Sequence, residues 1–206
     1  MARSVRDGVR LGLLGGTFNP PHIAHLVCAA EALDQLGLDR VELVPVHTPP
    51  HKEADADPGV PCRLELCELA VAGEARLGVS RADSDVPGRS FTVDTLRRLH
   101  AQRPQDELTF IVGGDMARSF PGWREPETIL ELAEVGVAGR DDLDQSAIGE
   151  QLAPLRGAPE RIRYFDMPRL DISSSMLRRR VAAGRPIRHL VPDAVADAIA
   201  NAGLYR

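Results

Sequence analysis

The sequence is poor in the features that mark several protein classes. It has three cysteines, an odd number, and no C-x-x-C pair, so it predicts neither a disulfide framework nor a zinc site. No apolar run approaches the ~20 residues that a membrane span needs. The residues before the first glycine pair contain no signal-peptide core. We therefore expect a cytoplasmic protein with no membrane partner.

Positive charge is outweighed by negative charge. The 206 residues include 25 Lys and Arg against 30 Asp and Glu, a net charge of −5. This balance argues against sequence-independent binding of nucleic acid, although a local pocket can still bind a small anion. Hydrophobic residues at 43% and charged residues at 27% are typical of a globular protein. The length predicts one domain, which we expect over residues 9–206 after an extension of residues 1–8.

Apolar runs alternate with helical periodicity along the chain. Residues 9–14 and 41–46 predict strands, and the segment between them repeats apolar residues on one helical face. Such a strand–helix–strand unit predicts parallel strands. Further strands are expected near 77–81, 108–112, 135–138 and 162–165. We expect an α/β fold: a Rossmann-like, doubly wound parallel sheet with helices on both faces, and a small C-terminal helical subdomain at about 171–206.

Two glycines and two histidines follow the first predicted strand. Gly15 and Gly16 lie where open α/β sheets bind ligands, and glycine lets the backbone approach a phosphate. His22 and His25 are three residues apart, on one face of the next helix. They lie at its N-terminal end, where free backbone N–H groups attract anions. Alone, a glycine pair more often marks a tight turn, and two histidines at this spacing more often lie on the surface without a ligand.

Two cationic groups follow other elements. Lys52 lies in a proline-rich loop after the second strand, as a point charge suited to a phosphate. Ser173 and Ser174 open a helix that carries Arg178, so hydroxyl groups and free amides form an anion nest. Alone, these would be a solvated lysine and an ordinary serine cap.

A glycine-rich turn with an acid follows a later strand. Asp115 ends the run Gly-Gly-Asp that starts at Gly113, and the one tryptophan, Trp123, lies eight residues further on. The acid could accept a ribose hydroxyl, and the indole could stack on a ring or pack in the core. Each of these signals is modest, but all of them follow strands that end at one edge of the sheet. Together they predict a nucleotide site for more than one phosphate group.

Several motifs resemble one enzyme family. G-G-T-F-N-P-P-H-I-A-H at 15–25 and I-S-S-S-M-L-R at 172–178 are similar to paired signatures of the nucleotidyltransferase superfamily. Within it, P-P-H-K at 49–52, F-T-V-D-T-L at 91–96 and F-P-G-W-R-E-P-E-T-I-L at 120–130 resemble bacterial nicotinate-nucleotide adenylyltransferases. The likeness spans about residues 9–206. Departures include Asn19 for a commoner Asp, and Arg124 where an aromatic residue is frequent.

The resemblance implies a reaction: ATP and nicotinate mononucleotide give deamido-NAD and pyrophosphate by direct in-line attack, without a covalent intermediate. Elementary chemistry is consistent with it. A phosphate monoester has a second pKa of about 6, so it is mostly dianionic at neutral pH and needs no general base. Positioning and charge neutralisation then supply the catalysis. Mg²⁺ is expected to accompany the ATP phosphates.

The resemblance also implies a set of site residues. The expected catalytic residues are His22, His25, Lys52 and Arg178. The expected ATP-binding residues are Gly15, Gly16, Phe18, His22, His25, Lys52, Gly113, Asp115, Ile172, Ser173, Ser174 and Arg178. The expected nicotinate-nucleotide-binding residues are Gly16, Thr17, Phe18, Lys52, Thr92, Asp115, Trp123 and Arg124. No residue is expected to ligate a metal directly.

Other functions stay open. A sister enzyme would adenylylate nicotinamide mononucleotide or phosphopantetheine with the same nucleotide half of the site. A nucleotide-sensing module would bind without turnover, and a scaffold protein would not respond to ATP at all. The expected partners are ATP and nicotinate mononucleotide. The oligomeric state is undetermined, and a homo-oligomer is compatible with the sequence.

Overall fold

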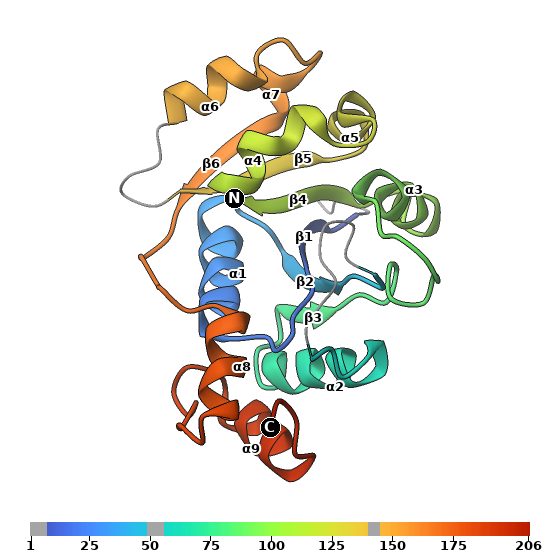
Figure 1. The fold of residues 1–206 in the computed structure, drawn as a ribbon. Helices are drawn as coiled ribbons and strands as arrows, with labels where there is room; N and C mark the ends of the chain where they lie inside the picture. Colours follow the sequence, from blue (N-terminus) through green and yellow to red (C-terminus); the bar gives the residue numbers. More distant parts are fainter. Residues whose placement is uncertain (1–7, 49–55, 140–144) are drawn as a thin grey trace, which may run out of the picture.

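A parallel sheet organises the chain in the computed structural model, which describes residues 8–48, 56–139 and 145–206 (Figure 1). The strands found there are β1 (Arg10–Gly16), β2 (Arg40–Pro45), β3 (Leu77–Val79), β4 (Glu107–Gly113), β5 (Glu134–Gly139) and β6 (Ile162–Asp166). Their order across the sheet is β3-β2-β1-β4-β5-β6, and each neighbouring pair is parallel. The predicted parallel α/β sheet is confirmed.

Helices connect the strands and continue beyond the last one. They are α1 (Ile23–Gln35), α2 (Val60–Val71), α3 (Thr92–Gln102), α4 (Gly114–Ser119), α5 (Pro126–Leu132), α6 (Gln145–Leu152), α7 (Ala158–Arg161), α8 (Ser174–Ala182) and α9 (Asp193–Asn201), with a 3-10 turn η1 (Phe120–Gly122). The short helices α4, α6 and α7 lie where periodicity predicts none. None of the helices in the described part of the chain is long and apolar enough to cross a membrane.

The two faces of the sheet are covered by different helices. Leu11 and Leu13 of β1 join a core cluster with residues of α3, α4, α5 and α6. Leu14 points to the opposite face, where α1 and Cys67 of α2 cover the sheet. This alternation is the period-two geometry of a strand. The expected helices on both faces of the sheet are therefore confirmed.

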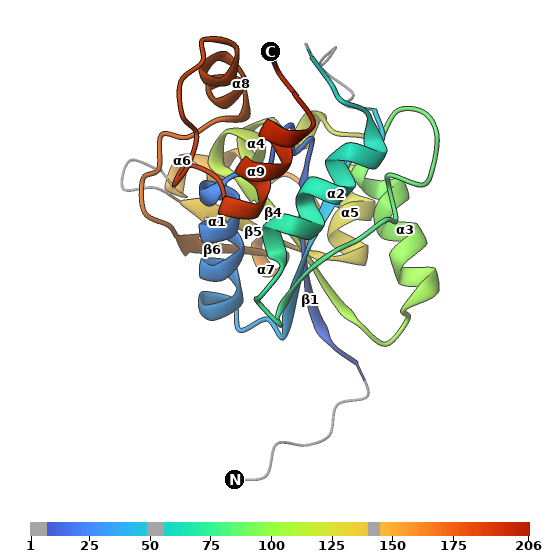
Figure 2. The same ribbon diagram turned by 90° about the horizontal axis from the view of Figure 1, so that it is seen from below.

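The C-terminal helices pack on α2 rather than on the sheet. Leu66 and Ala70 of α2 form a third cluster with Leu177 of α8, Val195 of α9 and Tyr205. Figure 2 shows α9 beside α2 at this contact. This places the start of α8 close to the turn after β1.

The strand order reverses between β1 and β4. From β1 the chain adds β2 and β3 on one side, and from β4 it adds β5 and β6 on the other. Because all strands are parallel, β1, β2 and β4 end at one edge of the sheet, at Gly16, Pro45 and Gly113. Leu14 of β1 is in register with Ile111 of β4, so the two glycine pairs that follow are neighbours. Open α/β sheets bind ligands at such a reversal.

Candidate active site

The turn after β1 is held close to the core by Phe18. The side chain of Phe18 is buried at 1% exposure, and its backbone has a φ of 51°, which is uncommon for a non-glycine residue. A Cβ at Gly16 would lie 3.0 Å from the Phe18 ring, so the glycine leaves room for the ring to fold back over the strand end. The turn therefore combines a buried anchor with exposed backbone at Gly15.

His22 and His25 form a stacked pair at the start of α1. The ring centroids are 3.6 Å apart with an interplanar angle of 20°, and the edge of the Phe18 ring contacts His25. The backbone N–H of His22 donates to Nδ1 of His25 at 3.1 Å. His25 therefore accepts through Nδ1, so its neutral ring carries the proton on Nε2. Nδ1 of His22 is buried without a hydrogen-bond partner among the described residues.

Burial keeps this pair uncharged. It lowers the pKa of His22 from 6.5 to about 4. Burial, and secondly the neighbouring His22, lower the pKa of His25 well below its usual value. Both rings are therefore neutral at physiological pH, and each can offer one N–H group to an anion.

The start of α8 is bonded to the same turn. The hydroxyl of Ser174 donates to the carbonyl of Pro20 at 2.8 Å, and the guanidinium of Arg178 donates to the carbonyl of Asn19 at 2.8 Å. Ser173 is the N-cap of α8, and its hydroxyl accepts a backbone N–H of the first turn at 3.2 Å. The serine–arginine segment predicted as an anion nest thus lies against the histidine-bearing turn.

Arg63 joins the turns after β1 and β2. It is fully buried at 0% exposure, and its guanidinium donates to the carbonyls of Thr17 and Val46 at 2.9 Å and of His47 at 3.0 Å. Its Nε donates to Asp57 at 3.0 Å. One cation therefore fixes the ends of two strands relative to each other and leaves little of its own charge unpaired.

Thr92, Trp123 and Arg124 define a second region beside α3. Thr92 is the first residue of α3, whose opening backbone N–H groups have no acceptor within the helix. Trp123 is half-buried, with its Nε1 donating to the hydroxyl of Ser119 at 3.1 Å. The ring centroids of Trp123 and Phe110 are 6.1 Å apart, and the two rings are nearly perpendicular. Trp123 is thus supported by the core on one side and remains partly exposed.

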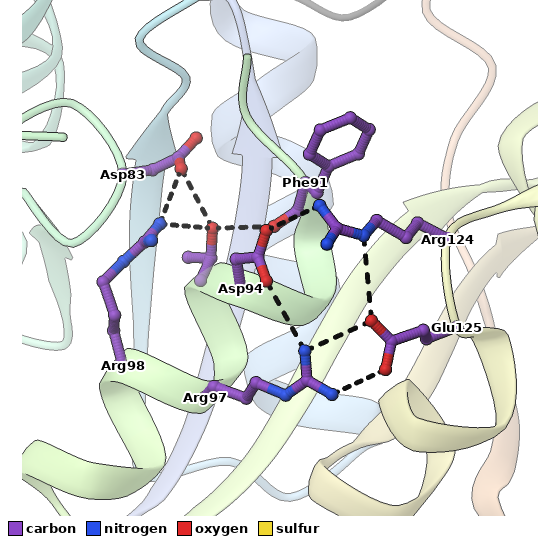
Figure 3. Close-up of polar contacts among 8 residues, drawn as sticks. Asp83, Phe91, Asp94, Arg97, Arg98, Arg124 and Glu125 are labelled. Carbon is purple, nitrogen blue, oxygen red and sulfur yellow. Dashed lines mark hydrogen bonds and ion pairs between the residues drawn. The ribbon is translucent and has the colours of Figure 1, made fainter. Parts of the chain in front are cut away.

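Arg124 belongs to a network of charges that spans α3 and the start of α5 (Figure 3). Its guanidinium lies 3.3 Å from Asp94 and 3.7 Å from Glu125, and 5.0 Å from the centre of the Phe91 ring. Arg97 bridges the same acids, at 3.5 Å from Asp94 and 2.6 Å from Glu125. Arg124 is half-exposed, and its charge is shared with these two carboxylates.

The other predicted residues differ in how they are placed. Gly113 ends β4 beside the first glycine turn. Asp115 lies in α4 with a fully exposed side chain, 3.3 Å from Arg118. Ile172 packs against the cluster between α2 and the C-terminal helices. Lys52 lies outside the described residues. Within the described ranges no three His, Cys, Asp or Glu side chains gather as a metal site would require.

Two supporting residues, Arg63 and Tyr205, are not among the expected site residues. Arg63 has a signal in the sequence: it falls on the apolar face of its helix, at helical spacing from the buried Leu66, Cys67 and Ala70. The contact that Tyr205 makes has no local signal, because its partner lies 186 positions away. Short-range patterns cannot detect such a pair.

Comparison with known proteins finds relatives along nearly the whole chain. Residues 13–180 match the family described as cytidylyltransferase-like. Two proteins named "Probable nicotinate-nucleotide adenylyltransferase", from Citrifermentans bemidjiense and Thermus thermophilus, are 42% and 41% identical to the chain. Both alignments cover 96% of this chain, and 98% and 100% of the respective relative.

A solved structure has a similar fold. Plasmodium falciparum nicotinic acid mononucleotide adenylyltransferase complexed with NaAD aligns with a TM-score of 0.76 at 16% identity. The alignment covers 96% of this chain and 97% of that one.

Proposed function

The chain belongs to the cytidylyltransferase-like family, and we propose that it transfers the adenylyl group of ATP to nicotinate mononucleotide in NAD biosynthesis. The products are deamido-NAD and pyrophosphate. The observation that carries the proposal is the neutral histidine pair, bonded through its turn to α8 at the sheet edge where the strand order reverses. Relatives of about 40% identity that bear this enzyme name support the choice of substrates.

The chemistry needs positioned donors rather than a base. The dianionic phosphate of nicotinate mononucleotide attacks the α-phosphorus of ATP. A new P–O bond forms there as the bond to the oxygen bridging to the β-phosphorus breaks, and pyrophosphate leaves with that electron pair. Negative charge shifts onto the bridging oxygen in the transition state. N–H groups already in place stabilise such charge without reorganising.

We assign the phosphate contacts of ATP to groups around the first turn. The free N–H groups of His22 and His25 would bind the α-phosphate, as neutral donors. Arg178, the hydroxyl of Ser173 and the backbone N–H of Ser174 would bind the β- and γ-phosphates together with Lys52, the only lysine in the chain. Mg²⁺ would arrive with ATP as part of the substrate, with phosphate oxygens among its ligands.

We assign the acceptor to the turn after β1 and to the region beside α3. Backbone of residues 16–18 would bind the mononucleotide phosphate, and Trp123 would stack on the pyridine ring. Backbone amides near Thr92 and Arg124 would receive the nicotinate carboxylate. Asp115 would meet a ribose, for which its full exposure leaves it accessible.

The test is pyrophosphate release with ATP and Mg²⁺, with three acceptors at equal concentration: nicotinate mononucleotide, nicotinamide mononucleotide and phosphopantetheine. We expect at least about tenfold preference for the nicotinate form, about 1.4 kcal/mol in the transition state. Preference for another acceptor would retain the chemistry and change the substrate. ATP binding without turnover would favour the sensing module.

The same assay tests the histidine assignment. His22→Ala removes one positioned donor, so kcat at saturating substrate is expected to fall by about 10²–10³-fold. His100→Ala, on an exposed position of α3, is the matched control and should keep normal kcat. Near-normal kcat in His22→Ala would refute the role given to the pair.

A further inference from the structure

The turn that carries the histidine pair is held from the C-terminal part of the chain. The contacts of Ser174 with Pro20 and of Arg178 with Asn19 come from α8. A third bond joins the backbone N–H of Ile23 to a carbonyl in the segment between α8 and α9, at 3.1 Å. The fourth comes from beyond α9, where the hydroxyl of Tyr205 donates to Oδ1 of Asn19 at 2.7 Å.

Tyr205 is held in place by its surroundings. Its ring is buried at 8% exposure in the cluster between α2 and the C-terminal helices. Its φ of 62° lies in the left-handed region, which a bulky residue adopts only when the surrounding structure imposes it. The tail therefore turns back at this residue and directs the ring toward the turn after β1.

The hydroxyl of Tyr205 is a permanent donor. Burial raises the pKa of the Tyr205 hydroxyl well above its usual value, so the group stays protonated at any physiological pH. Its hydrogen bond to Asn19 is buried, and a donor–acceptor distance of 2.7 Å is typical of a well-formed O–H···O bond.

Asn19 connects this bond to the site. It is 2% exposed, and its carbonyl is occupied by Arg178 while its side-chain oxygen is occupied by Tyr205. Its amide nitrogen lies 3.5 Å from the carbonyl of Ala56. Asn19 is three residues before His22, so the position of its backbone limits where the histidine pair can lie.

We propose that Tyr205 is a positioning residue for this site: its hydroxyl fixes Asn19 and thereby the turn that presents His22 and His25. Tyr205 does not touch the reacting atoms. Its effect on turnover rests on the proposed adenylyl transfer, whereas its effect on the histidine rings does not.

Tyr205→Phe removes the hydroxyl and keeps the ring. We expect kcat for adenylyl transfer to fall about three- to tenfold, the loss that one net hydrogen bond predicts when it supports transition-state geometry. KM for nicotinate mononucleotide should stay within about twofold, because the pyridine and carboxylate contacts beside α3 are not involved. The imidazole NMR signals of His22 and His25 should shift, with assignments taken from single His→Gln variants.

The chain offers a matched control and a second variant. Its only other tyrosine, Tyr164, lies on β6 and packs against the core cluster that β1 forms with α3, α4, α5 and α6. Tyr164→Phe should therefore leave kcat and both histidine signals unchanged. In an Asn19→Ala background, Tyr205→Phe should have no further effect on kcat, because the acceptor is already gone. Asn19→Asp keeps an acceptor oxygen and should retain the sensitivity to Tyr205→Phe.

The outcomes separate the two proposals. Unshifted histidine signals in Tyr205→Phe overturn the positioning role, and so does normal kcat with only a lower melting temperature. An equal loss in the presence and absence of the Asn19 side chain would show that Tyr205 does not act through Asn19. If the wild-type chain turns over none of the acceptors but the signals shift as expected, the proposed function fails and the positioning role stands.

Discussion

Burial lowers the pKa of His22 to about 4, so the ring stacked on His25 is neutral when the protein is folded. In an unfolded chain the same side chain titrates at about 6.5. The folded state therefore binds fewer protons than the unfolded state at any pH between these values. His25 acts in the same direction, because its pKa is also lowered by burial.

This difference predicts acid sensitivity. Above about pH 6.5 the His22 ring is mostly neutral in both the folded and the unfolded state, so its titration hardly changes the free energy of unfolding. As the pH falls toward 4, the unfolded chain gains a proton that the folded one does not, so the free energy of unfolding decreases. For His22 alone the loss is about 3 kcal/mol by pH 4.

Urea unfolding at a series of pH values measures the effect. The free energy of unfolding of His22→Gln should fall less steeply with acid than that of the wild-type protein, by about that amount between pH 7 and pH 4. His100→Gln, at an exposed position, should follow the wild-type slope. Parallel slopes for wild type and His22→Gln would contradict a neutral buried ring.

A second prediction concerns Arg63. Arg63→Met keeps much of the volume but leaves the carbonyls of Thr17, Val46 and His47 without this donor, and Asp57 without this cation. Breaking a buried pair in this way costs about 3 kcal/mol or more of the free energy of unfolding. Arg81→Met, whose ion pair with Asp85 is exposed, should cost less than about 1 kcal/mol and serves as the control. A loss below about 1 kcal/mol for Arg63→Met would show that water replaces its contacts.

The strands were predicted well, and three of the short helices were not. The strands β1, β2, β4, β5 and β6 coincide with apolar runs that the sequence shows directly. The helices α4, α6 and α7 have at most eight residues, too few turns for a 3.6-residue period to be visible. The helix α2 begins at Val60, and Pro61 is tolerated there because the first helical turn does not need its N–H group.

Contact between β1 and the segment after α1 depends on Gly12, which has no side chain. A Cβ at Gly12 would lie 2.7 Å from side-chain atoms of Leu38 and Val41, and 3.0 Å from Ile111. All three belong to the core cluster on the α1 face of the sheet. Gly12 therefore allows the chain that follows α1 to pack directly on the central strand.

Gly12→Ala is expected to destabilise the protein by about 1–3 kcal/mol through overpacking, measured by urea unfolding. Gly122→Ala provides the comparison, because no atom lies within 4 Å of a Cβ built there. If both variants lose the same stability, the effect would come from replacing glycine in general and not from the close contact at β1.

At the scale of the molecule, topology was the most predictable property. One strand–helix–strand unit near the N-terminal end implies parallel strands, and continued alternation then implies a sheet with two covered faces. The placement of cationic and hydroxyl groups near one strand edge follows from the same geometry. The sequence could not show that Arg178 and Ser174 reach the β1 turn, because those bonds join residues more than 150 positions apart.

The net negative charge of the chain opposes the binding of negatively charged substrates at the proposed site. A chain of net charge −5 repels a polyanion at long range, yet its proposed substrates are both anionic. Two cations, Arg178 and the buried Arg63, donate to the turns after β1 and β2, where the substrates are proposed to bind. Arg63 is largely neutralised by Asp57 and by carbonyl dipoles, so it holds the turns in place more than it attracts ligand.

The bond between Asn19 and Tyr205 also sets an order of events during protein synthesis. A ribosome makes Asn19 early and must add 186 further residues before its partner exists. During that interval β1 and α1 can form, but the histidine turn lacks one of its fixing contacts. If Tyr205 positions the site as proposed, a nascent chain would transfer the adenylyl group slowly until Tyr205 has been added and has folded against Asn19. Copies cut before Tyr205 by a premature stop or a protease would lack the same contact.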